Sequence, residues 1–214
     1  MKGTFKLGKI AGIGLFIHWT FSLLILFIVY VNYKAGQNTP QILWSLLFVS
    51  CIFLTVLLHE LGHALTAKKY GIKTKDITLL PIGGLARLER LPEKPSEELM
   101  VAFAGPLVNI VLAFLTSFFI SLPNTSEEMV TQLSNGVNAD NFFLNFYLVN
   151  IVLAFFNLIP AFPMDGGRIL RALLAYKMER HVATKIAARI GQLLAIGFVF
   201  LGFYSNPFLI IIGI

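Results

Sequence analysis

The chain has 214 residues, of which 57% are hydrophobic and 13% are charged, and its formal net charge is +6. Soluble domains usually carry about a quarter charged residues, so this composition excludes an ordinary soluble globular domain. Several uncharged runs reach the roughly 20 residues that a helix needs to cross a bilayer, which predicts a polytopic membrane protein.

These runs predict an all-α membrane protein of about six helices, with residues 1–214 forming one transmembrane domain. Residues 10–33 exceed the core of a signal peptide, which has about 7–15 residues, so we interpret them as a retained first span. Residues 207–214 follow a turn signal and would reach only about 12 Å as a helix, so we expect an incomplete sixth span. The expected spans are 10–33, 42–67, 99–122, 141–164, 185–204 and the partial 207–214.

The basic residues are distributed unevenly between the expected loops. All but one of the 17 Lys and Arg residues precede the first span, or lie between spans two and three or spans four and five. The exception is Lys34. Because cytoplasmic loops are rich in Lys and Arg, we expect a multi-pass protein of the cytoplasmic membrane with its N-terminus and its active-site opening on the cytoplasmic side. The basic charge is then a topology signal, and we expect no nucleic-acid partner.

Residues 76–88, between the second and third spans, are rich in β-forming residues on either side of Pro81 and the pair Gly83-Gly84. This pattern predicts a small membrane-associated β-hairpin or sheet. Two interpretations stay open. The hairpin either connects two helices only, or it presents an exposed strand edge that pairs with an extended peptide near an active site.

The second span ends in His59-Glu60-Leu61-Gly62-His63. A helix turns by about 100° per residue, so His59 and His63 lie on one face, one turn apart. Two imidazoles in this arrangement can bind one metal ion while Glu60 holds a water, which is the zinc metalloprotease pattern. Ionisable groups within a spanning helix are costly and usually functional, which favours a metal site over structural hydrogen bonding.

A catalytic zinc site has three protein ligands, so the two histidines need one more. Asp165 is the candidate because it follows the fourth span among Pro and Gly residues, which break a helix where the backbone is buried or lines a wet cavity. The directions of the spans place Asp165 and His63 in the same half of the bilayer. The alternative for Asp165 is a helix cap or an ion pair with Arg168.

Other polar residues within the apolar runs have two interpretations each. From the residues alone, Asn157 is interpreted as an interhelical hydrogen-bonding group, with a contact to the oxyanion of a tetrahedral intermediate as its functional alternative. His18 is interpreted as a packed or interfacial residue. The same packing interpretation applies to Asn109, Asn145 and Asn150.

The chain resembles the site-2 protease family of intramembrane zinc metalloproteases, and most closely its archaeal and bacterial branch. The resemblance depends on three separated motifs: HELGH at 59–63, FAGPLVN at 103–109 and NLIPAFPMDGGR at 157–168. PIGGLA at 81–86 also resembles the family's glycine-bearing loop.

The resemblance implies one Zn²⁺ per chain, bound by His59, His63 and Asp165, with Glu60 as the general base. It implies that Asn157 contacts the substrate or the oxyanion. It also implies that the chain hydrolyses peptide bonds within or near a transmembrane helix of another, membrane-anchored protein.

A different class of protein also fits the intramembrane ligands, namely a polytopic metal-binding or metal-transport protein without protease activity. Such a protein would use His59, His63 and Asp165 but would give Glu60 no necessary role. A membrane-anchored protease for soluble substrates is a third interpretation. The short segments outside the expected spans oppose it, because they leave little room for a separate peptidase domain.

Overall fold

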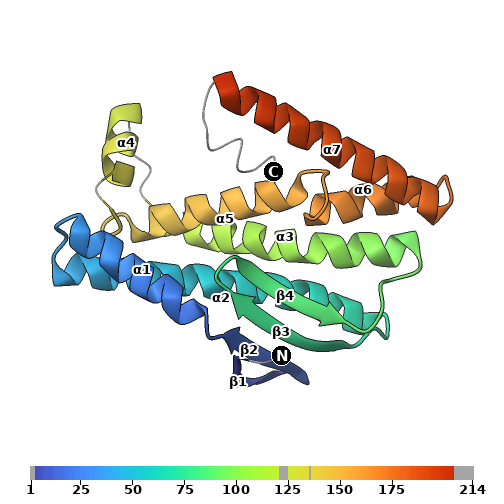
Figure 1. The fold of residues 1–214 in the computed structure, drawn as a ribbon, viewed down its shortest axis with the longest axis horizontal. Helices are drawn as coiled ribbons and strands as arrows, with labels where there is room; N and C mark the ends of the chain where they lie inside the picture. The colour runs from blue at the N-terminus through green and yellow to red at the C-terminus, as the bar shows by residue number, and fades with distance from the viewer. Residues whose placement is uncertain (1–2, 121–124, 135, 205–214) are drawn as a thin grey trace.

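The computed structural model describes residues 3–120, 125–134 and 136–204. Helices lie side by side through most of the molecule, and a small sheet covers one side of them (Figure 1). Within these described residues, three helices are long and apolar enough to cross a membrane: α2 (Thr39–Lys69), α3 (Pro95–Ser117) and α7 (Arg180–Tyr204). Two shorter apolar helices are α1 (Phe21–Lys34) and α5 (Phe142–Leu158). The chain is therefore a mainly helical membrane protein.

The expected first helix, residues 10–33, is wrong in its first half, where the chain forms a β-hairpin. Strands β1 (Thr4–Ile10) and β2 (Ile13–His18) pair antiparallel. Ala11 and Gly12 join them with φ angles of 53° and 90°. Two-residue turns with positive φ at both positions match the twist of the flanking strands. This run is uncharged because β2 enters a buried sheet, and only the 14 residues of α1 are helical.

The predicted hairpin after the second span is present as β3 (Thr74–Leu80) and β4 (Gly83–Leu88). It belongs to a larger sheet than expected, with the strand order β1-β2-β3-β4 and a parallel pairing of β2 with β3. β4 is thus an edge strand of this sheet. The sheet packs on α2 through a buried apolar cluster of Ile13, Leu15, Leu61, Ala64 and Ile77.

The helix that carries the HELGH motif, α2, has 31 residues. Asn38 caps its first turn by accepting from the backbone N–H of Gln41, whose side chain in turn accepts from the backbone of Asn38. This reciprocal capping box fixes where the helix begins. α3 packs along α2, and Gly62 permits their close approach, because a Cβ there would lie 2.8 Å from the carbonyl oxygen of Ala104.

The expected fourth span, residues 141–164, is too long at its C-terminal end. α5 ends at Leu158, and an irregular turn follows that contains Pro160 and Pro163. Proline has no backbone N–H to continue a helix, which explains the break. A separate, shorter helix, α6 (Asp165–Ala175), then begins. The third expected span, 99–122, corresponds to α3, which begins and ends about four residues earlier.

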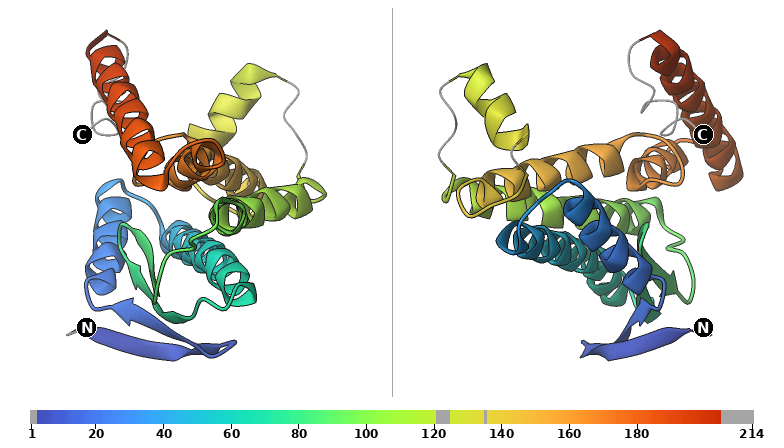
Figure 2. Two further views of the ribbon diagram at one scale, coloured as in Figure 1. Left: turned by 90° about the vertical axis from the view of Figure 1, so that its right-hand side faces the viewer. Right: turned by 60° about the vertical axis from the view of Figure 1, so that its left-hand side comes forward.

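The described residues contain seven helices, not about six. α6 and α4 (Ser126–Ser134) were not expected as separate helices; α4 lies in the loop expected between spans three and four. The fifth expected span, 185–204, corresponds to α7, which begins at Arg180. Figure 2 shows α4 and α7 on the side of the molecule opposite the sheet. The expected partial span 207–214 lies outside the described residues.

Candidate metal centre

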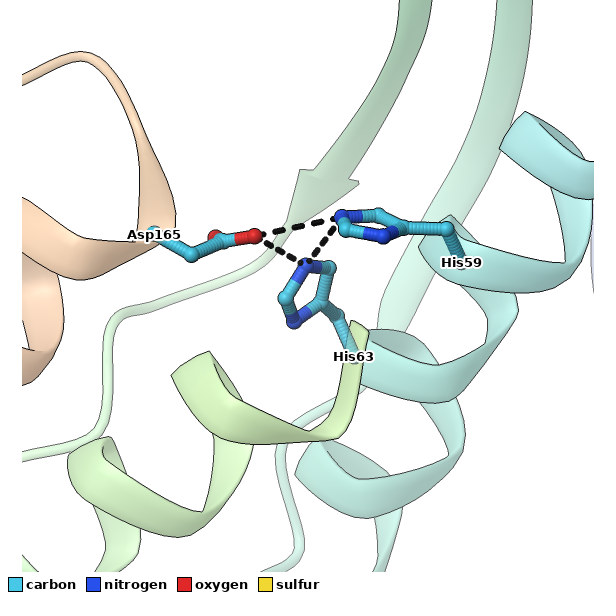
Figure 3. Close-up of side chains that lie close together, drawn as sticks. All are labelled: His59, His63 and Asp165. Carbon is cyan, nitrogen blue, oxygen red and sulfur yellow. Dashed lines mark hydrogen bonds and ion pairs between the residues drawn. The ribbon is translucent and has the colours of Figure 1, made fainter. Parts of the chain in front are cut away.

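Three buried side chains from two helices converge: His59 and His63 from α2, and Asp165, the first residue of α6 (Figure 3). Oδ2 of Asp165 lies 3.1 Å from Nε2 of His59 and 3.0 Å from Nε2 of His63. The two Nε2 atoms are 3.1 Å apart. The structure thus brings together the three residues that the sequence indicated as ligands.

Hydrogen bonds on the far side of each imidazole decide which nitrogen faces this centre. Nδ1 of His63 lies 2.7 Å from the carbonyl oxygen of Val101. Nδ1 of His59 lies 2.6 Å from Oδ1 of Asn109. Both partners are oxygens that can only accept, so both Nδ1 atoms donate. In a neutral imidazole the other nitrogen then carries a lone pair, and both Nε2 lone pairs face the carboxylate.

The orientation of the Asn109 amide follows from a second buried asparagine. Nδ2 of Asn150 donates to the carbonyl oxygen of Phe146 at 2.9 Å, which turns its Oδ1 toward Asn109. Nδ2 of Asn109 donates to that Oδ1 at 3.3 Å, which leaves Oδ1 of Asn109 for His59. The packing interpretation of both asparagines was therefore incomplete. The available signal was the position of Asn109 at the end of the FAGPLVN motif.

This set of atoms fits a divalent metal ion. Three lone-pair atoms within 3.1 Å of one another repel unless a cation lies among them. A tetrahedral ion with ligands at about 2.0–2.2 Å keeps those ligands about 3.3 Å apart, close to the observed spacing. Two imidazoles and one carboxylate are a donor set of catalytic zinc, which leaves a fourth position for water or substrate.

The backbone of α3 closes one side of the centre at Gly105. A Cβ at this position would overlap Nε2 of His63 and would lie 2.6 Å from Nε2 of His59. Gly166, the residue after Asp165, permits a different close approach, because a Cβ there would overlap the carbonyl oxygens of Leu158 and Ile159 at the end of α5. Glycine at these two positions therefore lets α3 approach the histidines and lets α6 begin directly against the end of α5.

A cavity of about 530 Å³ opens beside the three ligands. Glu60 lines this cavity, and a Cβ at Gly84 would lie 2.6 Å from its Cγ, so β4 passes directly against Glu60. Asn157 also lines the cavity. Its Nδ2 donates one proton to the carbonyl oxygen of Leu153 at 2.9 Å, which leaves the second amide proton for another acceptor.

Two further sequence interpretations have structural counterparts. Nη1 of Arg168 lies 3.8 Å from Oδ1 of Asp165, so the ion pair considered for Asp165 exists beside its contacts with the histidines. His18 lies at the end of β2, and its Nδ1 is 2.8 Å from the hydroxyl of Thr20. His18 does not line the cavity beside the metal centre.

The long apolar helices and the buried His/His/Asp centre define the class of this protein. It is a membrane protein with a metal site of the kind found in hydrolases. The chain matches the model of peptidase family M50 over two overlapping segments, residues 47–138 and 125–198. It therefore belongs to this family, the site-2 proteases, as its motifs predicted.

Individual relatives agree with this assignment. The chain is 41% identical over 216 residues to a zinc metalloprotease of Methanocaldococcus jannaschii, covering 99% of this chain and 58% of that protein. It is 35% identical over 137 residues to stage IV sporulation protein FB of Bacillus subtilis, covering 64% of this chain and 43% of that protein. The chain thus spans about half the length of these curated relatives.

The fold is similar to a solved structure, the site-2 protease from Methanocaldococcus jannaschii. The TM-score is 0.64 with 40% sequence identity, and the match covers 98% of this chain and 90% of the solved one.

Proposed function

We propose that this chain is an intramembrane zinc metalloprotease that hydrolyses peptide bonds within or near a transmembrane helix of a membrane-anchored protein. His59, His63 and Asp165 hold one Zn²⁺, and Glu60 is the general base. The observation that carries this proposal is the convergence of two imidazole nitrogens and one carboxylate oxygen beside a cavity that Glu60 and a strand edge also line. Among the relatives, the zinc metalloprotease of Methanocaldococcus jannaschii supports the choice of metal and reaction.

The chain's own residues supply the proton transfers. When bound, zinc would supply Lewis acidity, which lowers the pKa of a water molecule and polarises the scissile carbonyl. Glu60 accepts the proton of the attacking water and returns it to the leaving amine. The second N–H of the Asn157 amide donates a hydrogen bond to the carbonyl oxygen of the substrate, on which negative charge develops. Both side chains line the same cavity, which supports these two roles.

The edge of β4 holds the substrate in this proposal. A transmembrane helix satisfies its peptide groups internally, so a segment must unwind before water can attack one of its bonds. Residues 82–86, at the start of β4 and the turn before it, line the cavity beside Glu60. An extended segment that pairs with this edge would regain its lost hydrogen bonds. This geometry favours the edge-pairing interpretation of the hairpin over a purely connecting role.

We place the protein in the cytoplasmic membrane, with its N-terminus and the cavity opening on the cytoplasmic side. Lys68 and Lys69 lie at the C-terminal end of α2, close in sequence to His59 and His63. Basic residues concentrate on the cytoplasmic side of membrane proteins. The metal centre would then lie in the cytoplasmic half of the bilayer.

The decisive experiment compares the intact protein with the Glu60→Gln variant, both purified in detergent. Zinc content and cleavage of a labelled transmembrane peptide are measured on the same samples. We expect Glu60→Gln to keep one zinc per chain and to lose cleavage by about 100-fold or more, since a general base contributes about 10²–10⁴. Glu93→Gln is the matched control, because the Glu93 side chain is 80% exposed.

The alternatives give different results in this experiment. If the intact protein and Glu60→Gln both bind zinc but neither cleaves a panel of transmembrane peptides, a metal-binding or metal-transport function replaces the protease. If Glu60→Gln cleaves as fast as the intact protein, Glu60 is not the base. If the intact protein binds no zinc, the metal assignment is wrong.

A further inference from the structure

A buried ion pair outside the cavity joins the helix α6, which carries Asp165, to α3. Glu98 lies in the first turn of α3 and is 1% exposed. Its Oε1 accepts from Arg171 of α6, from Nε at 2.9 Å and also from Nη2. Nη2 of Arg180, at the start of α7, lies 3.4 Å from the other carboxylate oxygen of Glu98. The guanidinium of Arg171 also lies over the ring of Phe162, 5.4 Å from its centroid.

The same face of α3 contacts both histidines. Counted along the helix, Glu98, Val101, Gly105 and Asn109 follow one another at intervals of three and four residues, which places them on one face. Val101 accepts from His63, Asn109 accepts from His59, and Gly105 lies against both rings. α3 therefore holds the histidines at one point along its length and α6 at another.

We propose that Glu98 and Arg171 are positioning residues for the third metal ligand. This inference rests on the proposed metal-dependent function. Asp165 follows an irregular turn after α5, so its distance from α2 depends on how α6 packs and not on the geometry of one continuous helix. The contact of Arg171 with Glu98 sets this distance through α3, about 9 Å along α6 from Asp165. With the contact in place, Oδ2 of Asp165 meets both Nε2 atoms at 3.0–3.1 Å.

Stability alone does not require a charged pair at this position. Replacing a buried ion pair by apolar residues of similar volume is often neutral or stabilising, whereas removing one partner is strongly destabilising. A guanidinium differs from an apolar side chain because its planar fork of N–H groups fixes direction as well as distance. Nε and Nη2 of Arg171 both point to Glu98, which sets the orientation of α6.

The test separates folding from positioning by removing both charges together. The full chain is purified in detergent, stripped of metal and titrated with Zn²⁺ against a chromophoric chelator, while thermal unfolding is followed separately. In the double variant Glu98→Leu/Arg171→Met we expect the unfolding temperature to be retained. The Kd for zinc should rise about tenfold or more, as for other groups that orient metal ligands.

Arg180→Met is the matched control, because Arg180 contacts the same carboxylate from α7 and its side chain is 37% exposed. We expect this variant to bind zinc with the affinity of the intact protein. If the double variant is folded and binds zinc as tightly as the intact protein, the positioning role is overturned. If the intact protein itself binds no zinc, the proposed function fails, which is a distinguishable result.

A second variant covers the case in which the double variant does not fold. Glu98→Gln keeps the shape of the side chain and one acceptor oxygen for Arg171. We expect it to fold and to weaken zinc binding several-fold. An unchanged Kd in this folded variant would also overturn the positioning role.

Discussion

The two halves of the metal centre are built in different ways. His59 and His63 lie four residues apart on α2, so the backbone hydrogen bonds of one helix fix their spacing. Asp165 lies 102 residues after His63 and begins a short helix after an irregular turn. Its distance to the histidines depends on how α6 packs against α3. The first half is therefore set locally and the second by tertiary structure.

This difference gives α3 a central part, since it contacts both halves and supplies no ligand itself. Its residues fix the rotation of the two imidazoles through Val101 and Asn109, and the placement of Asp165 through Glu98. A change on α3 should affect metal binding according to which half it touches. We expect the loss of zinc affinity to be largest for a change that touches both histidines, smaller for a change that touches one histidine, and absent for a change in the sheet.

Gly105→Ala should have the largest effect, because the added methyl group would occupy the space of both Nε2 atoms. Relief of this overlap requires the imidazoles to rotate or α3 to move away from α2, and core positions tolerate such added volume poorly. We expect zinc affinity to fall by about 100-fold or more, beyond the loss typical of an outer-shell change. Metal content after dialysis against a chelator measures this.

Gly197→Ala in α7 is the control for the backbone effect of replacing a helical glycine. A Cβ at Gly197 meets no atom within 4 Å. We expect zinc binding to be unchanged and stability to rise slightly, since alanine favours helix by up to about 1 kcal/mol. Equal zinc loss in the two variants would contradict the steric explanation for Gly105.

Asn109→Leu should affect only the histidine half. The variant removes the acceptor for Nδ1 of His59 and leaves this donor buried without its partner. The imidazole can then place its proton on Nε2, which removes the lone pair that faces the metal. We expect zinc affinity to fall about 10–100-fold, as for other partners that orient a metal-ligating histidine. Isothermal titration of the metal-stripped protein measures the change.

A conservative variant distinguishes this explanation from a general loss of packing. Asn109→Asp keeps an acceptor oxygen toward His59, so it should recover most of the affinity. Asn145→Leu serves as a control, since the Asn145 amide donates to the carbonyl oxygen of Asn141 within its own helix. Weak binding in Asn109→Asp that matches Asn109→Leu would refute the tautomer argument.

The sequence predicted the helices of the fold more accurately than it predicted the structure of the first 20 residues. Uncharged length separates an apolar segment from a polar one but does not separate a helix from a strand. The segment Ile10 to Gly14 is apolar because it turns at Ala11-Gly12 and enters a buried sheet. The parallel pairing of β2 with β3 joins residues some 60 positions apart, and no local pattern reveals it.

The histidine half of the candidate site could be predicted from the sequence because a single helix contains it. His59, Glu60 and His63 follow from the HExxH pattern and from the turn of a single helix, which places both histidines on one face. Asp165 could be selected as a candidate from the Pro and Gly residues around it, and the resemblance to a family strengthened the choice. The hydrogen-bond partners of the histidines were missed, because an asparagine in an apolar helix has the same appearance whether it packs or orients a ligand.

The smallest effect on the metal centre should come from the sheet, which forms a wall of the cavity and supplies no ligand. Arg87 in β4 donates to Asp76 in β3, with Nε at 2.7 Å from Oδ1, and this guanidinium holds the pKa of Asp76 below its ordinary value of 3.8. A lowered folded pKa gives stabilisation that is fully present above the unfolded pKa and is lost as the pH falls through the folded pKa.

Hydrogen exchange of residues 83–88 in metal-stripped protein should therefore be about a few-fold faster in Asp76→Asn at pH 7, a modest effect because the pair is partly exposed. This difference should disappear as the pH falls through the lowered pKa of Asp76, because the carboxyl group of the intact protein is then itself protonated. Zinc affinity at pH 7 should not change, and a loss comparable to that of Asn109→Leu would show that the sheet, too, positions the ligands.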